Sequence, residues 1–186
     1  MTRCISLLIG YMLGNFLTAE AVSRLMAGKS AFSMGSGNPG MLNTVRNLGK
    51  GWGVVVLAGD FAKTALACAL SAALFPAAWE TAVTYGGLGA VLGHLFPFWH
   101  RFRGGKGVAC TGTAALCRSL IWGGAACLAG LAAVLIVPRH KTAAGALVIP
   151  AVFSLLSFRC FGPETGCIWL ILTALSLWAF RADWKG

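Results

Sequence analysis

Seven apolar runs separated by short polar segments constrain this chain more than any other feature. They cover residues 4–25, 53–78, 81–99, 107–117, 119–137, 143–161 and 166–180. A helix that crosses a bilayer needs about 20 mostly apolar residues, and only 11% of the 186 residues are charged. The sequence therefore predicts an all-α integral membrane bundle of about seven transmembrane helices, formed as a single domain over residues 1–186. It excludes a soluble globular enzyme.

Two of the runs leave an alternative to consider. The run 107–117 has too few residues for a full crossing and joins the next run through Arg118, so a re-entrant segment there would reduce the count to six spans. The first run has the position of a signal peptide. However, Asn15 and Glu20 follow without a small-x-small cleavage site, so we expect this run to remain as a helix of the mature protein.

Positive charge predicts the orientation of the bundle. The chain has 15 Lys and Arg against 5 Asp and Glu, a formal net charge of +10, and Lys and Arg accumulate in cytoplasmic loops. With the amino terminus outside, Arg3, Arg118 and Arg159 lie outside and Lys63 lies within a span. The others then lie inside: Arg24, Lys29, Arg46, Lys50, Arg101, Arg103, Lys106, Arg139, Lys141, Arg181 and Lys185. We therefore expect an odd number of crossings, a cytoplasmic carboxy terminus and no nucleic-acid partner, since topology and anionic ligands account for the charge.

The longest polar segment, residues 27–51, contains a glycine-rich loop on the side predicted to be cytoplasmic. Gly35, Gly37 and Gly40 allow positive φ angles that turn successive N–H groups toward one point, and such a nest binds an anion. The same segment adds side-chain donors and a planar cation suited to phosphate oxygens, at Ser36, Asn38, Asn43 and Arg46. The alternative is a flexible turn followed by a basic interfacial helix.

A second glycine-rich loop, at residues 93–107, lies on the same side. Gly104, Gly105 and Gly107 surround Lys106, whose ammonium we expect to point into a cavity formed by backbone. The loop lacks the G-x-x-x-x-G-K-[ST] pattern, so nucleotide hydrolysis is not predicted. His94 lies just inside the membrane boundary, where a helix–helix hydrogen bond and a role in the site are both open. The aromatic residues of this loop are typical of an interfacial belt: Phe96, Phe98, Trp99 and Phe102.

Ionisable residues also lie inside the apolar runs. Asp60 and Lys63 are spaced i and i+3, and we interpret them as a structural ion pair because an unpaired charge in lipid costs several kcal/mol. Glu20 is expected to pair in the same way with a loop cation such as Arg46. The seven cysteines include no C-x-x-C pair and carboxylates are few, so the sequence predicts neither a disulfide framework nor a metal site.

Taken together, the loops resemble those of the bacterial PlsY family of membrane glycerol-3-phosphate acyltransferases, over about residues 11–112. The matching residues are Gly35, Ser36, Gly37, Asn38, Gly40, Asn43, Arg46, Leu48, Gly49, Lys50, Asp60, Lys63, Gly93, His94, Phe96, Pro97, Phe102, Gly104, Gly105, Lys106, Gly107, Val108 and Ala109. The resemblance implies a seven-helix enzyme of the bacterial inner membrane. Its cytoplasmic loops would bind two phosphate substrates while the acyl chain lies among the helices and membrane lipid.

The implied reaction belongs to phospholipid biosynthesis and uses no cofactor. It transfers a fatty acyl group from acyl phosphate to the 1-hydroxyl of glycerol 3-phosphate, giving lysophosphatidic acid and phosphate. By resemblance, the expected catalytic residues are Ser36, Arg46, His94 and Lys106. The expected substrate- and phosphate-binding residues are Gly35, Gly37, Asn38, Gly40, Asn43, Gly104, Gly105 and Gly107. The sequence contains no Ser-His-Asp or Cys-His arrangement for a covalent acyl-enzyme, and proton removal is open between His94 and a substrate phosphate.

Three departures from the family pattern leave other functions open. Leu42 stands where the family usually has threonine, Gly145 ends a segment that lacks the family's serines, and Asp183 lies where a His-Arg-x-Asn segment is expected. One alternative is an acyltransferase with a different acyl group or phosphorylated acceptor. Another is a noncatalytic membrane protein that binds lipid head groups or acyl phosphate. A transporter is disfavoured because the chain has no repeated halves.

Overall fold

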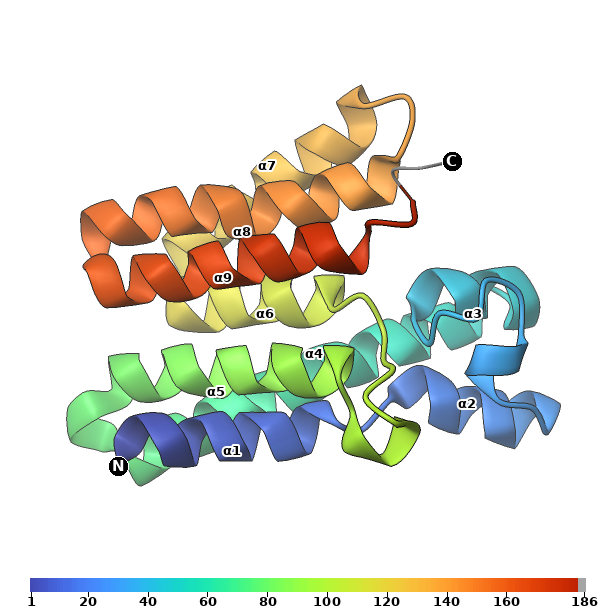
Figure 1. Ribbon diagram of the computed structural model, residues 1–186, viewed down its shortest axis with the longest axis horizontal. Coiled ribbons are helices and arrows are strands. Elements are labelled where there is room, and N and C mark those ends of the chain that lie inside the picture. Colours follow the sequence, from blue (N-terminus) through green and yellow to red (C-terminus); the bar gives the residue numbers. More distant parts are fainter. Residues whose placement is uncertain (184–186) are drawn as a thin grey trace.

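Breaks at Asn, Gly and Pro residues divide the chain into helices in the computed structural model, which describes residues 1–183 (Figure 1). Within that range there are nine α-helices and no strands. They are α1 (Thr2–Gly14), α2 (Thr18–Ala27), α3 (Met41–Leu48), α4 (Lys50–Leu74), α5 (Trp79–Leu95), α6 (Val108–Arg118), α7 (Leu120–Ile136), α8 (Lys141–Cys160) and α9 (Pro163–Ala179). Three short 3-10 helices, η1 (Ala31–Ser33), η2 (Pro76–Ala78) and η3 (Phe98–His100), lie in the connections. The all-α prediction is confirmed.

The seven predicted apolar runs correspond to α1 with α2, and then to α4 through α9. Successive long helices run back and forth, so the two termini lie at opposite ends of the bundle (Figure 1). The α2–α3, α5–α6 and α7–α8 connections share one end with the last turn of α9, and we call this the loop end. An odd number of crossings stays a prediction, and both glycine-rich loops lie at the same end of the bundle.

The first apolar run is two helices, not the single one expected. The helix stops after Gly14 and resumes at Thr18, with Leu17 in an extended conformation. The Asn15 side chain explains the break, because its Oδ1 accepts a hydrogen bond from Phe98 N at 2.7 Å. The break thus ties the first run to the second glycine-rich loop.

The short run 107–117 forms a separate helix, α6, and the choice between a full crossing and a re-entrant segment stays a prediction. Helix α6 has 11 residues, which rise only about 16 Å. Nevertheless its start packs on Leu95 at the end of α5, and its last residue, Arg118, reaches Glu80 at the start of α5. Helix α6 therefore packs antiparallel to α5, although it has 11 residues against 17, and the loop before it folds back onto the end of α5.

Within residues 1–183, three helical segments are long and apolar enough to cross a membrane by length and composition alone: Thr2–Ala27, Lys50–Leu74 and Lys141–Cys160. Helices α7 and α9 are shorter apolar helices of 17 residues each. The outer face of α7 carries large apolar side chains that are more than 70% exposed, namely Leu120, Ile121, Leu135 and Ile136. Such a face is suited to lipid.

Small residues bring α1 and α5 into backbone contact. Gly10 and Gly14 on α1 face Gly89 and Gly93 on α5, and a Cβ atom added at any of them would overlap backbone atoms of the other helix. This spacing of four residues is a frequent close-packing pattern in membrane helices. The contact places Tyr11 so that its hydroxyl donates to Phe96 O at 2.8 Å, at the start of the second loop.

Candidate functional site

Glu20 anchors the first loop from within α2. Its Oε2 accepts hydrogen bonds from Ser30 Oγ at 2.9 Å and Ala31 N at 2.7 Å, while its Oε1 accepts from Arg24 Nε at 2.6 Å. The expected pairing of Glu20 with Arg46 is therefore wrong. Arg24 lies one helical turn along the same face, whereas Arg46 is exposed on α3.

Asn43 organises the first loop from the start of α3. Its Oδ1 accepts from Ser36 N at 3.0 Å and Ser36 Oγ at 3.2 Å, and its Nδ2 donates to Ala31 O and Met34 O. The side chain is only 4% exposed. Its hydrogen-bonding groups are directed into the loop, so the predicted contact between Asn43 and substrate stays a prediction that the geometry does not support.

The expected backbone nest is largely occupied by hydrogen bonds inside the loop. Gly35 and Gly37 have the positive φ angles that were predicted, 52° and 69°, but the expectation is wrong for Gly40, which is extended with a φ of −151° ahead of α3. However, Gly37 N donates to Met34 O and Gly40 N donates to Asn38 O, both at 2.9 Å. The loop is thus an internally hydrogen-bonded turn, and the group that it presents to the neighbouring cavity is the Asn38 side chain.

The second loop folds directly onto the end of α5. Gly105 N donates to His94 O at 3.0 Å, and a Cβ at Gly104 would overlap the His94 and Leu95 carbonyl oxygens. Glycine is needed at both positions because the backbone passes so close. Gly107 has a φ of 73° and begins α6.

The two glycine-rich loops meet at Gly105. A Cβ there would lie 3.0 Å from Pro39 O of the first loop and would overlap the His94 imidazole beneath it. Beside this junction is a cavity of about 220 Å³ between the loops and the end of α9. Its polar lining comes from Asn38, Arg103, Lys106 and Arg181, together with the backbone of Gly104 and Gly105. The two loops, predicted to lie on the same side of the bundle, are therefore in contact, and residues of both line this cavity.

Lys106 also contacts the carboxy-terminal segment. Its Nζ forms an ion pair with Asp183 and lies 4.4 Å from the centre of the Phe180 ring. The expectation that this ammonium points into a cavity formed by backbone is therefore wrong, because side chains of the carboxy-terminal segment surround it. The pairing was missed because the two residues are 77 positions apart. Of the cations predicted to lie at this end, Lys185 falls outside the described residues.

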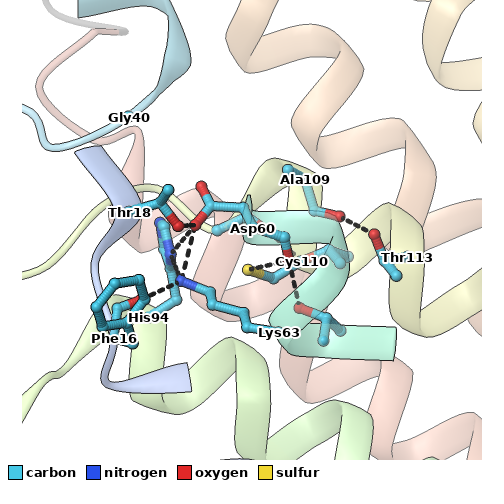
Figure 2. A network of polar contacts seen from close by, with 12 residues as sticks. Phe16, Thr18, Gly40, Asp60, Lys63, His94, Ala109, Cys110 and Thr113 are labelled. Atoms are coloured by element: carbon cyan, nitrogen blue, oxygen red, sulfur yellow. Dashed lines mark hydrogen bonds and ion pairs between the residues drawn. The ribbon is translucent and has the colours of Figure 1, made fainter. Parts of the chain in front are cut away.

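A buried polar network lies beneath the loops (Figure 2). Lys63 Nζ lies 2.8 Å from Asp60 Oδ1, which confirms the predicted ion pair, and 2.8 Å from His94 Nδ1. It also donates to Phe16 O, which the break between α1 and α2 leaves free. Thr18 Oγ1 donates to Asp60 Oδ1 at 3.2 Å. The network therefore joins the first run, α4 and the end of α5. The contacts with Phe16 O and Thr18 were missed by sequence reasoning, because only tertiary packing brings these residues to α4.

The network fixes the tautomer of His94. An ammonium group only donates hydrogen bonds, so Nδ1 must accept from Lys63 and the proton of the neutral ring lies on Nε2, which faces Gly105. Among the described residues, Asp60, His94 and Cys110 have ligand atoms within 4.8 Å of one another, a spacing that would suit a metal ion. The Lys63 ammonium already supplies a cation between Asp60 and His94.

The remaining predicted residues lie near the loops without direct contacts to the network. Arg46 is exposed in the last turn of α3, with no partner among the described residues. Leu42, on the same helix, is 39% exposed. Gly145 packs between α8 and α7, against Val134 and the Gly130 carbonyl oxygen, so it contributes to helix packing.

The fold and site define a multi-pass membrane protein with a basic cavity where two glycine-rich loops meet. The chain belongs to the glycerol-3-phosphate acyltransferase family, whose model matches residues 4–186. It is 40% identical to glycerol-3-phosphate acyltransferase 1 of Lactobacillus johnsonii, over 98% of this chain and 87% of that protein. It is 35% identical to glycerol-3-phosphate acyltransferase 1 of Lactobacillus acidophilus, with the same coverage.

Solved structures agree with this assignment. The fold matches the crystal structure of PlsY, an integral membrane glycerol 3-phosphate acyltransferase, in its glycerol 3-phosphate form with a TM-score of 0.85. The match has 26% sequence identity and covers 100% of this chain and 91% of the other. The lysophosphatidic acid form of PlsY matches with a TM-score of 0.83 and 25% identity.

Proposed function

We propose that this acyltransferase moves a fatty acyl group from acyl phosphate to the 1-hydroxyl of glycerol 3-phosphate, at the loop end of the bundle. The observation that carries the proposal is the meeting of the two glycine-rich loops at Gly105. This contact places Asn38, Arg103 and Lys106 around one cavity. Two anionic substrates repel each other, and a cavity lined by donors and cations offsets that repulsion.

The reaction requires the protein to position its two substrates more than to activate them chemically. The acceptor hydroxyl oxygen attacks the carbonyl carbon of acyl phosphate, the bond from that carbon to the phosphate oxygen breaks, and phosphate departs. Phosphate is a competent leaving group and has oxygens that can take the hydroxyl proton. The role assigned to Lys106 is to neutralise phosphate charge, and the role assigned to Arg46 is to close over the substrate from the exposed face of α3.

His94 acts in this proposal as a positioning residue. Its Nδ1 is occupied by Lys63, and its Nε2 carries a proton toward the second loop. A ring with neither nitrogen free to accept a proton is a poor general base. We therefore assign proton removal to a substrate phosphate, and we assign His94 to holding Gly105 and Lys106 at the cavity. We assign Ser36, whose hydroxyl donates to Asn43 Oδ1, to the edge of the site that the first loop forms.

We further propose that the loop end faces the cytoplasm of a bacterial inner membrane. Ten of the described Lys and Arg residues lie at or near this end, against Arg3, Arg118 and Arg159 at the other. This asymmetry is the one expected for an amino terminus outside the cell. It also places the phosphate cavity on the side where phosphorylated metabolites are made.

The test is an assay of purified protein with palmitoyl phosphate, with and without glycerol 3-phosphate. We expect acceptor-dependent release of phosphate and formation of lysophosphatidic acid, and loss of both in Lys106→Ala without loss of membrane insertion. Gly51→Ala, at an open helical position, is the matched control. Product with a different phosphorylated alcohol but not with glycerol 3-phosphate would favour the altered-acceptor alternative. Saturable acyl-phosphate binding without any product would favour a noncatalytic binding protein.

A further inference from the structure

A second polar cavity lies at the end of the bundle opposite the loops. It has a volume of about 100 Å³ and lies between the start of α5, the end of α6 and the start of α9. Thr81, Thr84, Tyr85 and Thr165 give it a lining of hydroxyl groups. Nothing in the proposed acyl transfer uses this end of the molecule.

The cavity contains a buried arginine whose hydrogen bonds are incomplete. The Arg118 side chain is 3% exposed, and its guanidinium lies 3.9 Å from the centre of the Phe161 ring. Its Nη2 donates to Glu80 Oε2 at 3.2 Å, but its Nε is buried without an acceptor among the described residues. A guanidinium has five N–H donors, and leaving a charged donor buried without an acceptor is unfavourable.

The two carboxylates of the cavity differ in how firmly they are held. Glu164 accepts from Arg3 Nε at 2.6 Å, from Arg3 Nη2 at 2.7 Å and from Tyr85 Oη at 2.9 Å. Its charge is therefore neutralised by a two-pronged pairing. Glu80 makes a single 3.2 Å contact with Arg118, and its side chain is 59% exposed. Arg118 is buried but Glu80 returns to solvent when it is released, so a stronger acceptor that keeps the guanidinium paired can replace it.

We propose that this cavity binds a phosphate group, with Arg118 as its main ligand. The planar guanidinium can hold two phosphate oxygens at once, and the hydroxyls of Thr81 and Thr165 can donate to the others, whereas those of Thr84 and Tyr85 already donate to Glu80 O and Glu164. Arg118 exchanges Glu80 for the phosphate, while Glu164 stays paired with Arg3. The cavity of about 100 Å³ has room for a phosphate group, because a single water molecule occupies only about 30 Å³. The phosphate comes from the head group of an anionic lipid or from the free ion, and the two sources are separable by experiment.

The position of the cavity favours access from the membrane surface. It is formed by helix ends, at residues 80–85, 118 and 161–168. Lipid head groups lie at this depth when the long helices cross the bilayer. The cavity is separate from the loops, since α5 and α6 run their whole lengths between the two sites (Figure 1).

The experiment measures binding to the full chain in detergent, with two probes. Phosphatidylglycerol binding is counted by native mass spectrometry, and inorganic phosphate is titrated by thermal unfolding. Four proteins are compared: the wild type, Arg118→Gln, Glu80→Gln and Arg159→Gln. Arg159 is an exposed cation at the same end and serves as the matched control for charge.

Glu80→Gln is the decisive variant, because Glu80 is exposed and its replacement leaves the buried packing unchanged. It removes the competing carboxylate, so affinity for the phosphate probe should rise about twofold to fivefold. Arg118→Gln should lower affinity about tenfold or more, and Arg159→Gln should match the wild type. Since the loop end also binds phosphate under the proposed function, only the changes caused by Glu80→Gln and Arg118→Gln are assigned to this cavity.

The outcomes separate the sources of the phosphate and can overturn the proposal. A gain in Glu80→Gln for phosphatidylglycerol alone identifies a lipid site, and a gain for inorganic phosphate alone identifies a site for the free ion. Unchanged affinity of Glu80→Gln for both probes would overturn the proposal. So would an equal loss in Arg118→Gln and Arg159→Gln. The acyl-transfer assay is independent of this result, so a failure here leaves the proposed function standing.

Discussion

At the scale of single residues, the site depends on how each charge is already paired before substrate arrives. Lys63 is buried between Asp60, His94 and Phe16 O, so its ammonium group already has its partners within the protein. Lys106, by contrast, is 29% exposed and pairs with a carboxylate that is 40% exposed. A buried pair is costly to break, whereas an exposed one contributes only about 0.2–1 kcal/mol. Lys106 is therefore the cation that a substrate phosphate can capture.

Asp183→Asn should strengthen the use of the phosphate substrates. The Asp183 carboxylate competes with phosphate for Lys106, and its removal should lower KM by roughly 1.5- to 5-fold with little change in kcat. Steady-state kinetics with each substrate varied in turn would measure this, with Ala182→Ser as the control. A higher KM in Asp183→Asn would mean that Asp183 helps to hold the substrate or the active position of Lys106.

Gly105→Ala should damage the junction between the two loops. The added methyl group meets the His94 imidazole and Pro39 O, so the loops must separate or the ring must move. Overpacking of this kind costs about 1–3 kcal/mol, and we expect kcat/KM to fall at least about tenfold. Gly51→Ala, where nothing lies within 4 Å, should retain full activity. Equal kinetics for the two variants would argue against a role for the junction in catalysis.

The sequence predicts the contacts and backbone angles of such residues only where neighbours in the chain determine them. The Asp60–Lys63 pair follows from helical spacing. The positive φ angles at positions 35 and 37 are expected because both residues are glycine. The partners of Glu20 and Asn43 cannot be predicted in this way, because a long polar segment offers many acceptors and only the folded loop selects among them. The incomplete hydrogen bonding of Arg118 is likewise visible only after α6 packs on α5.

At the scale of helices, close contact between α1 and α5 sets the position of the loops. Both helices carry glycines four residues apart, and their backbones touch along this line. The sequence contains both G-x-x-x-G spacings, at Gly10 and Gly14 and at Gly89 and Gly93, so close packing is predictable from it. The pairing of these two helices with each other is not, because other small residues in the chain present similar faces.

Gly10→Leu should separate α1 from α5 and destabilise the bundle. The leucine would overlap Gly86 and Ala90 backbone atoms, which cannot move as a side chain can. We expect a loss of about 3 kcal/mol in the free energy of unfolding, and lower activity because Tyr11 and Asn15 no longer hold the second loop. Unfolding in detergent would measure the loss. Gly124→Leu, in an open position on α7, should be close to the wild type. Similar losses in both would point to a general effect of helix composition.

At the scale of the whole molecule, the apolar runs and charge asymmetry predict more than any single motif does. Hydrophobic run length determines the crossings because backbone in lipid must be helical. The number of runs then fixes opposite ends for the two termini, as the structure confirms (Figure 1). The runs do not show how a short helix is placed against its neighbours, and α6 packs on α5 after the preceding loop has folded back onto the end of α5.

The orientation in the membrane is the last property that the charge pattern predicts, and exposed thiols can test it. Cys160, at the end of α8, is exposed at the end predicted to face outward, and Ser33 is exposed in the first loop. In variants where the other cysteines are replaced, a membrane-impermeant maleimide should label Cys160 in cells whose outer envelope is opened. It should label Ser33→Cys only after the inner membrane is permeabilised. The opposite pattern would place the loop end outside, away from cytoplasmic phosphorylated substrates. Because Lys and Arg are distributed so unequally between the ends, reversing the bundle would require moving most of its positive charge across the membrane.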